Sequence, residues 1–182
     1  MTADLLALRD DPFELLGALE KRLQATRIDV AAGAAQFWTG LGFRLGDRWL
    51  VVPREDVREV IMVPALTRVP GARPWLLGLA NVRGSLLPVC DVRRLLGEEH
   101  HTLARGSRVL VFNSDRVPAG FLVDEVVGYR QFTPADQRHE LAEDVGALKP
   151  YLLGAFARDA EPWLVMSLHK LAGGDAFSRA GW

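Results

Sequence analysis

An internal repeat constrains the fold of this chain more than any other feature of its sequence. Residues 74–95 align without a gap on residues 150–171, at a constant offset of 76 from Pro74 to Pro150. A proline, a Leu-Leu pair, a glycine, a valine and the final leucine coincide, and other positions hold physically similar pairs such as Trp75 and Tyr151. Self-similarity at a fixed spacing is the signature of a duplicated supersecondary unit. We therefore expect two similar units packed in one domain.

Short runs of β-branched, aromatic and leucine residues, broken by turn signals, indicate strands from about residue 37 onward. Gly46-Asp47 supplies a two-residue hairpin turn between an alternating run and the run 48–52. Further runs of this kind are residues 57–63, 109–112 and 119–123. Prolines stand beside or inside these runs, where a missing N–H is tolerated only at strand ends, edges or bulges. Small, strongly bent sheets or barrels are therefore favoured over one broad sheet.

A looser repeat extends the duplication beyond the aligned segments. The hairpin around Asp47-Arg48 pairs with that around Asp115-Arg116, and Asp56-Val57 pairs with Asp124-Glu125. We expect two similar β units, with the β domain spanning residues 37–174 and a C-terminal tail at 175–182.

The extension at residues 1–36 contains the strongest helix pattern of the chain, over about residues 12–25. Asp11 is a capping residue, Pro12 suits the first helical position, and Glu14 stands three residues after the cap. Leucines then follow at helical spacing. An amphipathic helix of this kind packs either on its own domain or on a partner protein, and the sequence leaves both open.

The overall charge argues against a polyanionic partner. The chain has 22 Lys and Arg residues against 23 Asp and Glu residues, a formal net charge of −1. A nucleic-acid binder would normally show a basic excess or a basic face. We expect no nucleic-acid partner, and a small-barrel nucleic-acid binder stays an alternative that salt-dependent DNA or RNA binding would reveal.

The sequence predicts a cytoplasmic protein without direct insertion into a membrane. No apolar run approaches the ~20 residues that a membrane-spanning helix needs, and the acidic start does not have the pattern of a secretory signal. The single cysteine, Cys90, lies in an apolar stretch, so we expect it to be a small buried hydrophobe and no intramolecular disulfide to form.

Signals for an enzyme are weak. The glycine-rich stretch 40–46 misses the dinucleotide-binding spacing by one residue and precedes a strand where it should follow one. His100-His101, in a polar connection, is a poor metal-ligand set. We predict no catalysis, no cofactor and no metal, with an enzyme that uses Cys90 or a histidine as the alternative.

The two copies of the repeat differ at the turn between their apolar runs. The first copy has Asn81-Val82-Arg83-Gly84 where the second has Ala157-Arg158-Asp159-Ala160. The fold requires a turn at both places but does not require this particular sequence, so the difference is a candidate for function. The planar guanidinium of Arg83 suits carboxylates or backbone carbonyls, and Gly84 is free to adopt a positive φ. The structural alternative is an exposed hairpin arginine, or one that only pairs with Glu59.

Several stretches, taken in order, resemble the signatures of the CheW-like chemotaxis coupling domain over about residues 39–172. They are Gly46-Asp47, Val57-Arg58-Glu59-Val60, Thr67-Arg68-Val69-Pro70 and residues 77–84, 87–93 and 120–126. The specific part is Asn-x-Arg-Gly followed by Pro-x-x-Asp-x-Arg. The preceding Asp-Pro-Phe-Glu-Leu-Leu segment is similar to the extension of PilI-type members, which serve the type IV pilus chemosensory system that controls twitching motility.

This resemblance implies an all-β fold of two five-stranded SH3-like β-barrels related by a pseudo-twofold repeat, with short helices after the repeated hairpins. It also implies a non-enzymatic adaptor between the cytoplasmic tip of a methyl-accepting chemoreceptor and the regulatory domain of a CheA-type histidine kinase, at receptor arrays on the inner face of the membrane. A small-barrel protein-binding module of another two-component pathway is the alternative.

The resemblance places the family's receptor-facing arginine at Arg83, its structurally important glutamate at Glu59 and the aspartate after the proline-containing strand at Asp91. We expect the apolar surface of Val57 and Pro88 to supply affinity while the arginine supplies orientation, because an exposed ion pair contributes only ~0–1 kcal/mol. The expected partner-binding residues are therefore Arg83, Asn81, Gly84, Glu59, Val57, Pro88 and Asp91.

One further hypothesis is that an ion pair between Glu59 and Arg83 positions the arginine. The chain also departs from the family pattern at three places, which are Ala160, Ser167 and the Gly128-Tyr129 pair. At Ala160 the family commonly has a glycine and at Ser167 an aspartate, so the second turn and the neighbouring helix cap are expected to differ.

Overall fold

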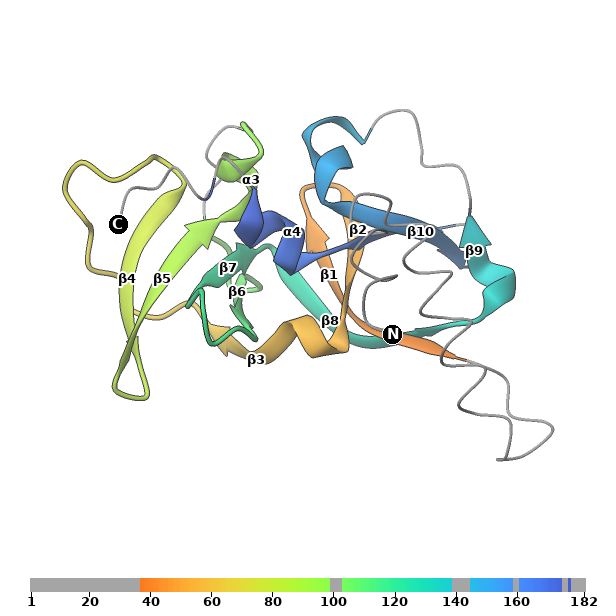
Figure 1. The fold of residues 1–182 in the computed structure, drawn as a ribbon, viewed down its shortest axis with the longest axis horizontal. Coiled ribbons are helices and arrows are strands. Elements are labelled where there is room, and N and C mark those ends of the chain that lie inside the picture. Colours follow the sequence, from red (N-terminus) through yellow and green to blue (C-terminus); the bar gives the residue numbers. More distant parts are fainter. Residues whose placement is uncertain (1–36, 99–102, 139–144, 159–160, 175–176, 178–182) are drawn as a thin grey trace, which may run out of the picture. The chain divides into compact units, whose positions relative to one another are not determined.

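The computed structural model describes residues 37–98, 103–138, 145–158, 161–174 and 177. The helix expected over about residues 12–25 lies outside this part of the chain. The compact unit that holds the described residues begins at Phe37. Strands make up most of it, with a few short helical segments, so the all-β prediction is confirmed (Figure 1).

The first sheet has six strands, in the order β8-β1-β2-β11-β10-β9. The strands are β1 (Trp38–Leu45), β2 (Arg48–Pro53), β8 (Glu125–Phe132), β9 (Gln137–Arg138), β10 (Leu152–Arg158) and β11 (Glu161–Met166). Only β2 and β11 run parallel to each other; the other neighbours are antiparallel. The two-residue turn predicted at Gly46-Asp47 joins β1 to β2.

The second sheet has five strands, in the order β3-β6-β7-β5-β4. They are β3 (Val57–Met62), β4 (Leu76–Val82), β5 (Ser85–Asp91), β6 (Arg108–Phe112) and β7 (Gly120–Val123). Here β5 and β7 are the parallel pair. The remaining elements are α3 (Val92–Leu95), α4 (Leu168–Gly173) and the 3₁₀ segments η1 (Arg54–Asp56), η2 (Pro134–Asp136) and η3 (Gly146–Tyr151). As expected, α3 and α4 each follow a hairpin of the repeat.

The offset of 76 found in the sequence also relates the hydrogen-bonded registers of the two hairpins. Val82 pairs with Ser85 in the β4–β5 hairpin, and Arg158 pairs with Glu161 in the β10–β11 hairpin. Both hairpins have a bulge at the same place, near their glycine. The predicted duplication is therefore confirmed residue by residue in the main-chain pairing.

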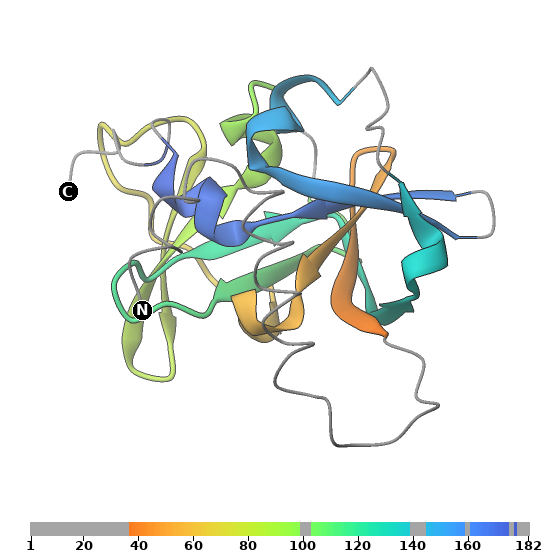
Figure 2. The same cartoon turned by 45° about the vertical axis from the view of Figure 1, so that its right-hand side comes forward.

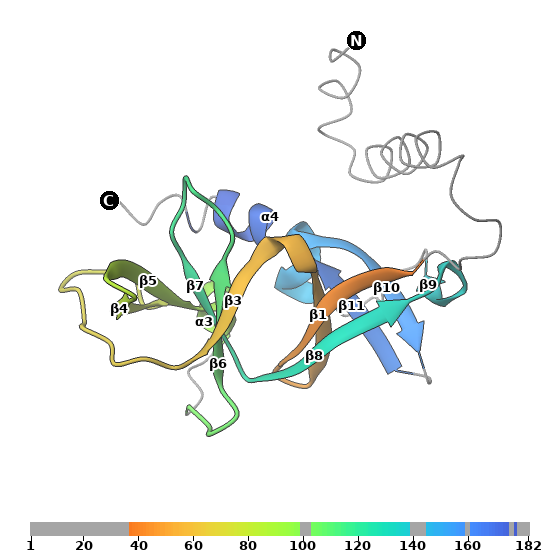
Figure 3. The ribbon, with the colours of Figure 1, turned by 90° about the horizontal axis from the view of Figure 1, so that it is seen from below.

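The two halves of the chain exchange a strand. β3 follows β2 in the chain but belongs to the five-stranded sheet, and β8 follows β7 but belongs to the six-stranded sheet. Figure 3 shows both strands leading from one sheet to the other. If the short β9 is set aside, each sheet has five strands in equivalent order, as the pseudo-twofold repeat predicts. Among the described residues, the first and last strands of each sheet are not hydrogen-bonded to each other. Main-chain pairing therefore does not close either sheet into the expected barrel.

The main core lies between the two sheets and receives large apolar side chains from both, including Phe43 and Leu50 from one and Leu110 and Phe121 from the other. Each sheet has a smaller cluster on its other face. Val51 belongs to one of these although its neighbour Leu50 is in the main core, because side chains alternate along a strand. Burial on both faces explains why the strands are nearly continuous apolar runs.

Candidate partner-binding site

The β4–β5 hairpin ends in the two-residue turn Arg83-Gly84, and its tip extends past the rest of its sheet (Figure 2). Both turn residues have a left-handed backbone, with φ of 53° at Arg83 and 85° at Gly84. Two consecutive left-handed residues match the twist of the flanking strands. The side-chain oxygen of Asn81 accepts a hydrogen bond from the Gly84 N–H at 2.9 Å. Asn81 and Gly84 therefore shape the turn that presents Arg83.

The Arg83 conformation is unfavourable for a residue with a side chain. Left-handed backbone costs an L-residue roughly 1–2 kcal/mol, because Cβ crowds the following carbonyl oxygen. Among the described residues that are not glycine, Arg83 alone has a positive φ. Glycine or asparagine would occupy this position at lower cost.

The guanidinium of Arg83 pairs with Glu59 on strand β3, with 2.7 Å between Nη2 and Oε2. The hypothesis of this ion pair is confirmed. The arginine side chain is 81% exposed and the glutamate 23% exposed. An ion pair that is this exposed stabilises the fold by ~0–1 kcal/mol at most. The contact engages one nitrogen of a guanidinium whose side chain is otherwise largely exposed.

Of the two apolar residues expected to contact a partner, one is buried and the other is half-buried. Pro88 is buried within β5, so its expected role as a contact residue is wrong. Val57 is half-buried, pairs with Phe112 on β6 and packs against the main core. Residues 87–91 are all buried, because both faces of this part of β5 are covered: Cys90 belongs to the main core and Val89 to the smaller cluster of the same sheet.

Asp91 is also not a surface residue, which corrects its assignment as a partner contact. It is 1% exposed, and its Oδ1 accepts hydrogen bonds from the backbone N–H groups of Arg93 at 3.0 Å and Arg94 at 3.3 Å. It is therefore the N-cap of α3. The equivalent Ser167 caps α4 by accepting a hydrogen bond from Lys170 N–H at 3.2 Å, so the departure from the family pattern changes the capping residue but keeps the cap.

Three exposed apolar residues on the elements that hold this site were missed from the sequence, and the least exposed of them is Val60 on β3, at 37%. Leu86 on β5, paired with Asn81 across the hairpin, is 68% exposed, and Met62 at the end of β3 is 75% exposed. Strand alternation was the available signal, since Leu86 precedes buried Leu87 and must point to the other face. The continuous apolar run 86–90 hid this alternation.

Catalytic chemistry has no support at Cys90. Its thiol is fully buried, as predicted, and burial raises its pKa to about 12. A thiol in this state is neither accessible nor ionised at neutral pH. In the described residues no group of three or more His, Cys, Asp or Glu side chains is placed to hold a metal ion. None of the helices in that part of the chain is long and apolar enough to cross a membrane.

The fold, the duplicated hairpins and the presented arginine define a CheW-like coupling domain, and residues 39–175 match that family. The chain therefore belongs to the CheW-like family, whose members are non-enzymatic scaffold and adaptor proteins of chemosensory systems. The prediction that the chain is not an enzyme is confirmed by this membership.

The chain is also similar to individual members of this family. The chain is 41% identical to Protein PilI of Pseudomonas aeruginosa over 163 residues, which cover 88% of this chain and 91% of that protein. It is 35% identical to Protein FrzA of Myxococcus xanthus over 94 residues, covering 52% and 59% of the two chains. The crystal structure of the scaffolding protein TtCheW from Thermoanaerobacter tengcongensis superposes with a TM-score of 0.66 at 20% identity, over 78% of this chain and 96% of that one. The similarity to the TtCheW structure supports the fold described above.

Proposed function

We propose that this chain is a coupling adaptor that joins the cytoplasmic tip of a methyl-accepting chemoreceptor to the regulatory domain of a CheA-type histidine kinase. The observation that carries the proposal is the turn of the β4–β5 hairpin. An exposed arginine occupies a left-handed position where glycine would be less strained, and it is oriented by Glu59. Backbone strain at an exposed, side-chain-bearing residue supports selection for the side chain itself.

The particular pathway we propose is the type IV pilus chemosensory system that controls twitching motility. Similarity to Protein PilI over most of both chains supports this assignment, as does the Asp-Pro-Phe-Glu-Leu-Leu segment at residues 11–16. In this role the protein is cytoplasmic and sits at receptor arrays on the inner face of the membrane. We assign the adaptor function to a domain at residues 37–174, flanked by an extension at 1–36 and a tail at 175–182; the family match over 39–175 supports this division.

The contact surface we propose combines Arg83 with exposed apolar side chains. Arg83 provides directional hydrogen bonds to carboxylates or carbonyl oxygens of the partner. Leu86, on the same hairpin, supplies apolar area that a partner can bury. Glu59 fixes the arginine, and Asn81 and Gly84 fix the turn.

Binding of the full chain to a purified CheA-type kinase and to a receptor signalling fragment tests this proposal. Arg83→Ala should weaken binding to at least one of them by roughly 2 kcal/mol or more, the loss expected of a hot-spot residue. Arg116→Ala is the matched control, because Arg116 is an exposed arginine in another turn, between β6 and β7. Unchanged binding of Arg83→Ala to both partners would contradict the assignment.

A further inference from the structure

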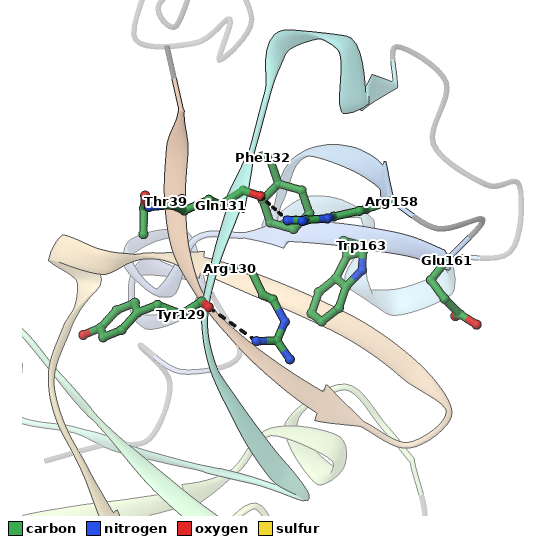
Figure 4. A pocket seen from close by; sticks show the side chains of 8 residues that line it. All are labelled: Thr39, Tyr129, Arg130, Gln131, Phe132, Arg158, Glu161 and Trp163. Atoms are coloured by element: carbon green, nitrogen blue, oxygen red, sulfur yellow. Dashed lines mark hydrogen bonds between the residues drawn. The ribbon is translucent and has the colours of Figure 1, made fainter. Parts of the chain in front are cut away.

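A pocket of about 600 Å³ opens on the six-stranded sheet, which is not the sheet that holds the Arg83 turn. Its lining side chains come from β1, β8, β10 and β11, as Figure 4 shows. Its volume is in the range of pockets that bind ligands or anchor side chains. The adaptor function proposed above makes no use of it.

The centre of the pocket is an arginine held against an aromatic ring. The guanidinium carbon of Arg130, on β8, lies 5.8 Å from the ring centroid of Trp163, on β11 (Figure 4). Trp163 is itself fixed by packing on Phe132 at 5.9 Å between ring centroids. A guanidinium placed over a ring keeps the N–H donors on its edge available for a planar acceptor.

Arg130 has no acidic partner within the described residues. Its only hydrogen bond there is a long one, 3.4 Å from Nη1 to the carbonyl oxygen of Tyr129. The Tyr129 side chain points away from the pocket centre (Figure 4). Arg130 is therefore half-buried, oriented and not neutralised by any described residue. A guanidinium in this arrangement can bind a carboxylate through charge-assisted hydrogen bonds.

A second arginine lies at the top of the pocket. Arg158, on β10, donates a hydrogen bond from Nη1 to the carbonyl oxygen of Gln131 at 2.7 Å, which fixes its side chain across the top of the pocket (Figure 4). Glu161 supplies one negative charge at the exposed rim. Asp136 also lies within electrostatic range of Arg158, so the positive charge that the pocket offers to an anionic group is that of Arg130.

Backbone features of β1 and β8 create the space for this arrangement. A Cβ on Gly42 would lie 3.0 Å from Trp163 Cζ3 and 3.1 Å from Arg130 Cγ, so both side chains would have to shift away from β1 if this residue were larger. β8 has a bulge opposite this glycine, followed by Gly128 with φ of 82°. The departure from the family pattern at Gly128-Tyr129 therefore lies directly before Arg130.

We propose that this pocket is a second partner-binding site, which takes a side-chain carboxylate from an acidic, leucine-bearing segment of a partner protein. Arg130 binds the carboxylate, and the Trp163 ring is the apolar wall for the neighbouring aliphatic group. Charge complementarity selects an acidic segment over a basic or neutral one. The site lies on a different sheet from Arg83 and acts independently of it.

Fluorescence anisotropy with the full chain tests the proposal. The probe is a fluorescein-labelled decapeptide of alternating glutamate and leucine, compared with the same peptide carrying glutamine in place of glutamate. We expect the acidic peptide to bind, and Arg130→Gln to weaken it by about tenfold or more, since a charge-assisted hydrogen bond is lost. Arg116→Gln removes the same charge from the other sheet and should change the affinity by less than about twofold.

The outcomes separate this proposal from the adaptor function. Failure of the acidic peptide to bind, equal binding of the glutamine peptide, or equal loss in Arg130→Gln and Arg116→Gln would each overturn the pocket. Arg83→Ala should bind the acidic peptide as the unmodified chain does, whatever it does to kinase and receptor binding. Arg130→Gln and Arg116→Gln should unfold at the same temperature. This measurement verifies that a loss of binding in Arg130→Gln does not come from a loss of folding.

Discussion

Asp56 and Leu168 are 112 residues apart in the sequence, yet the Asp56 carboxylate accepts a hydrogen bond from the Leu168 backbone N–H at 3.0 Å. Asp56 ends η1, directly before strand β3, and Leu168 begins helix α4. The aspartate is only 4% exposed, so this bond satisfies a buried donor at the start of the helix. It also fixes α4 to the segment where the chain crosses from one sheet to the other.

Asp56→Ala should lower the free energy of unfolding by about 1–3 kcal/mol, because it leaves the buried Leu168 N–H without its acceptor. Urea denaturation followed by circular dichroism measures the change. Asp47→Ala is the control, since Asp47 is an exposed turn residue and its replacement should change the free energy by no more than about 0.5 kcal/mol. Equal effects of the two substitutions would show that the contact between Asp56 and Leu168 carries little stability.

The same aspartate should make stability depend on pH. Burial raises the pKa of Asp56 above its usual 3.8, while the hydrogen bond from Leu168 and the charge of His169 act in the opposite direction. A raised pKa means that the folded state binds the proton more tightly than the unfolded state. The stabilising contribution of protonation is therefore complete below pH 3.8 and is lost as the pH rises through the raised pKa.

The unfolding free energy should therefore be measured across this pH range for a protein with Asp56 and for its Asp56→Asn variant. As the pH falls, the protein with Asp56 should become more stable relative to the variant. Both proteins should carry His169→Gln, because His169 lies 3.5 Å from Asp56 and its charge acts on the pKa of that carboxyl group. Glu55 is the other charged group that acts on Asp56, and it stays in both proteins. A difference that does not vary with pH, or that varies in the opposite sense, would refute the raised pKa.

The long-range contacts show where sequence reasoning ends. The gap-free offset of 76 predicted two similar β units with a turn at the same place in each, because local alternation and turn residues determine such units. The sequence did not predict that β3 and β8 each pair in the sheet of the other half. This pairing depends on which sheet edge each strand meets in the folded chain, and local residue patterns do not encode it. Asp56 and Asp124 were matched as equivalents in the looser repeat, but their burial became visible only in the folded chain.

In the candidate site, too, some features were predicted from the sequence and others were not. The turn at Arg83 follows from hairpin chemistry and was predicted, whereas its ion pair with Glu59 on β3 was a separate hypothesis that local pattern alone does not give. Asp91 was assigned to a partner although its side chain caps α3, because an aspartate before a short helix and an aspartate on a surface look alike in sequence. The pocket around Arg130 combines four strands, and no stretch of sequence contains it.

The two equivalent helix caps allow a matched comparison. Asp91→Ala should lower the unfolding free energy by about 1–2 kcal/mol, and by more than Ser167→Ala, because Asp91 accepts two backbone hydrogen bonds and Ser167 accepts one. At temperatures where Asp91→Ala remains folded, its affinity for kinase and receptor should match that of the unmodified chain. A loss of affinity without a loss of stability would restore Asp91 as a partner contact.

The strain at Arg83 can be separated from its function. Arg83→Gly should be more stable than Arg83→Ala by about 1 kcal/mol, because glycine adopts the left-handed backbone without the Cβ clash that alanine retains. Both variants should lose partner binding to the same extent, since both lack the guanidinium. Chemical denaturation and binding measured on the same samples test the two statements, and identical stabilities would mean that the turn relaxes in the alanine variant.

Cys90 provides a test of the enzyme alternative that needs no substrate. With the thiol fully buried and its pKa raised to about 12 by burial, a thiol reagent such as Ellman's reagent should react with the native protein only as fast as the fold opens. In urea the same cysteine should react immediately and with one equivalent. Fast labelling of the native chain would place an accessible thiolate at the end of β5 and would revive Cys90 as a nucleophile.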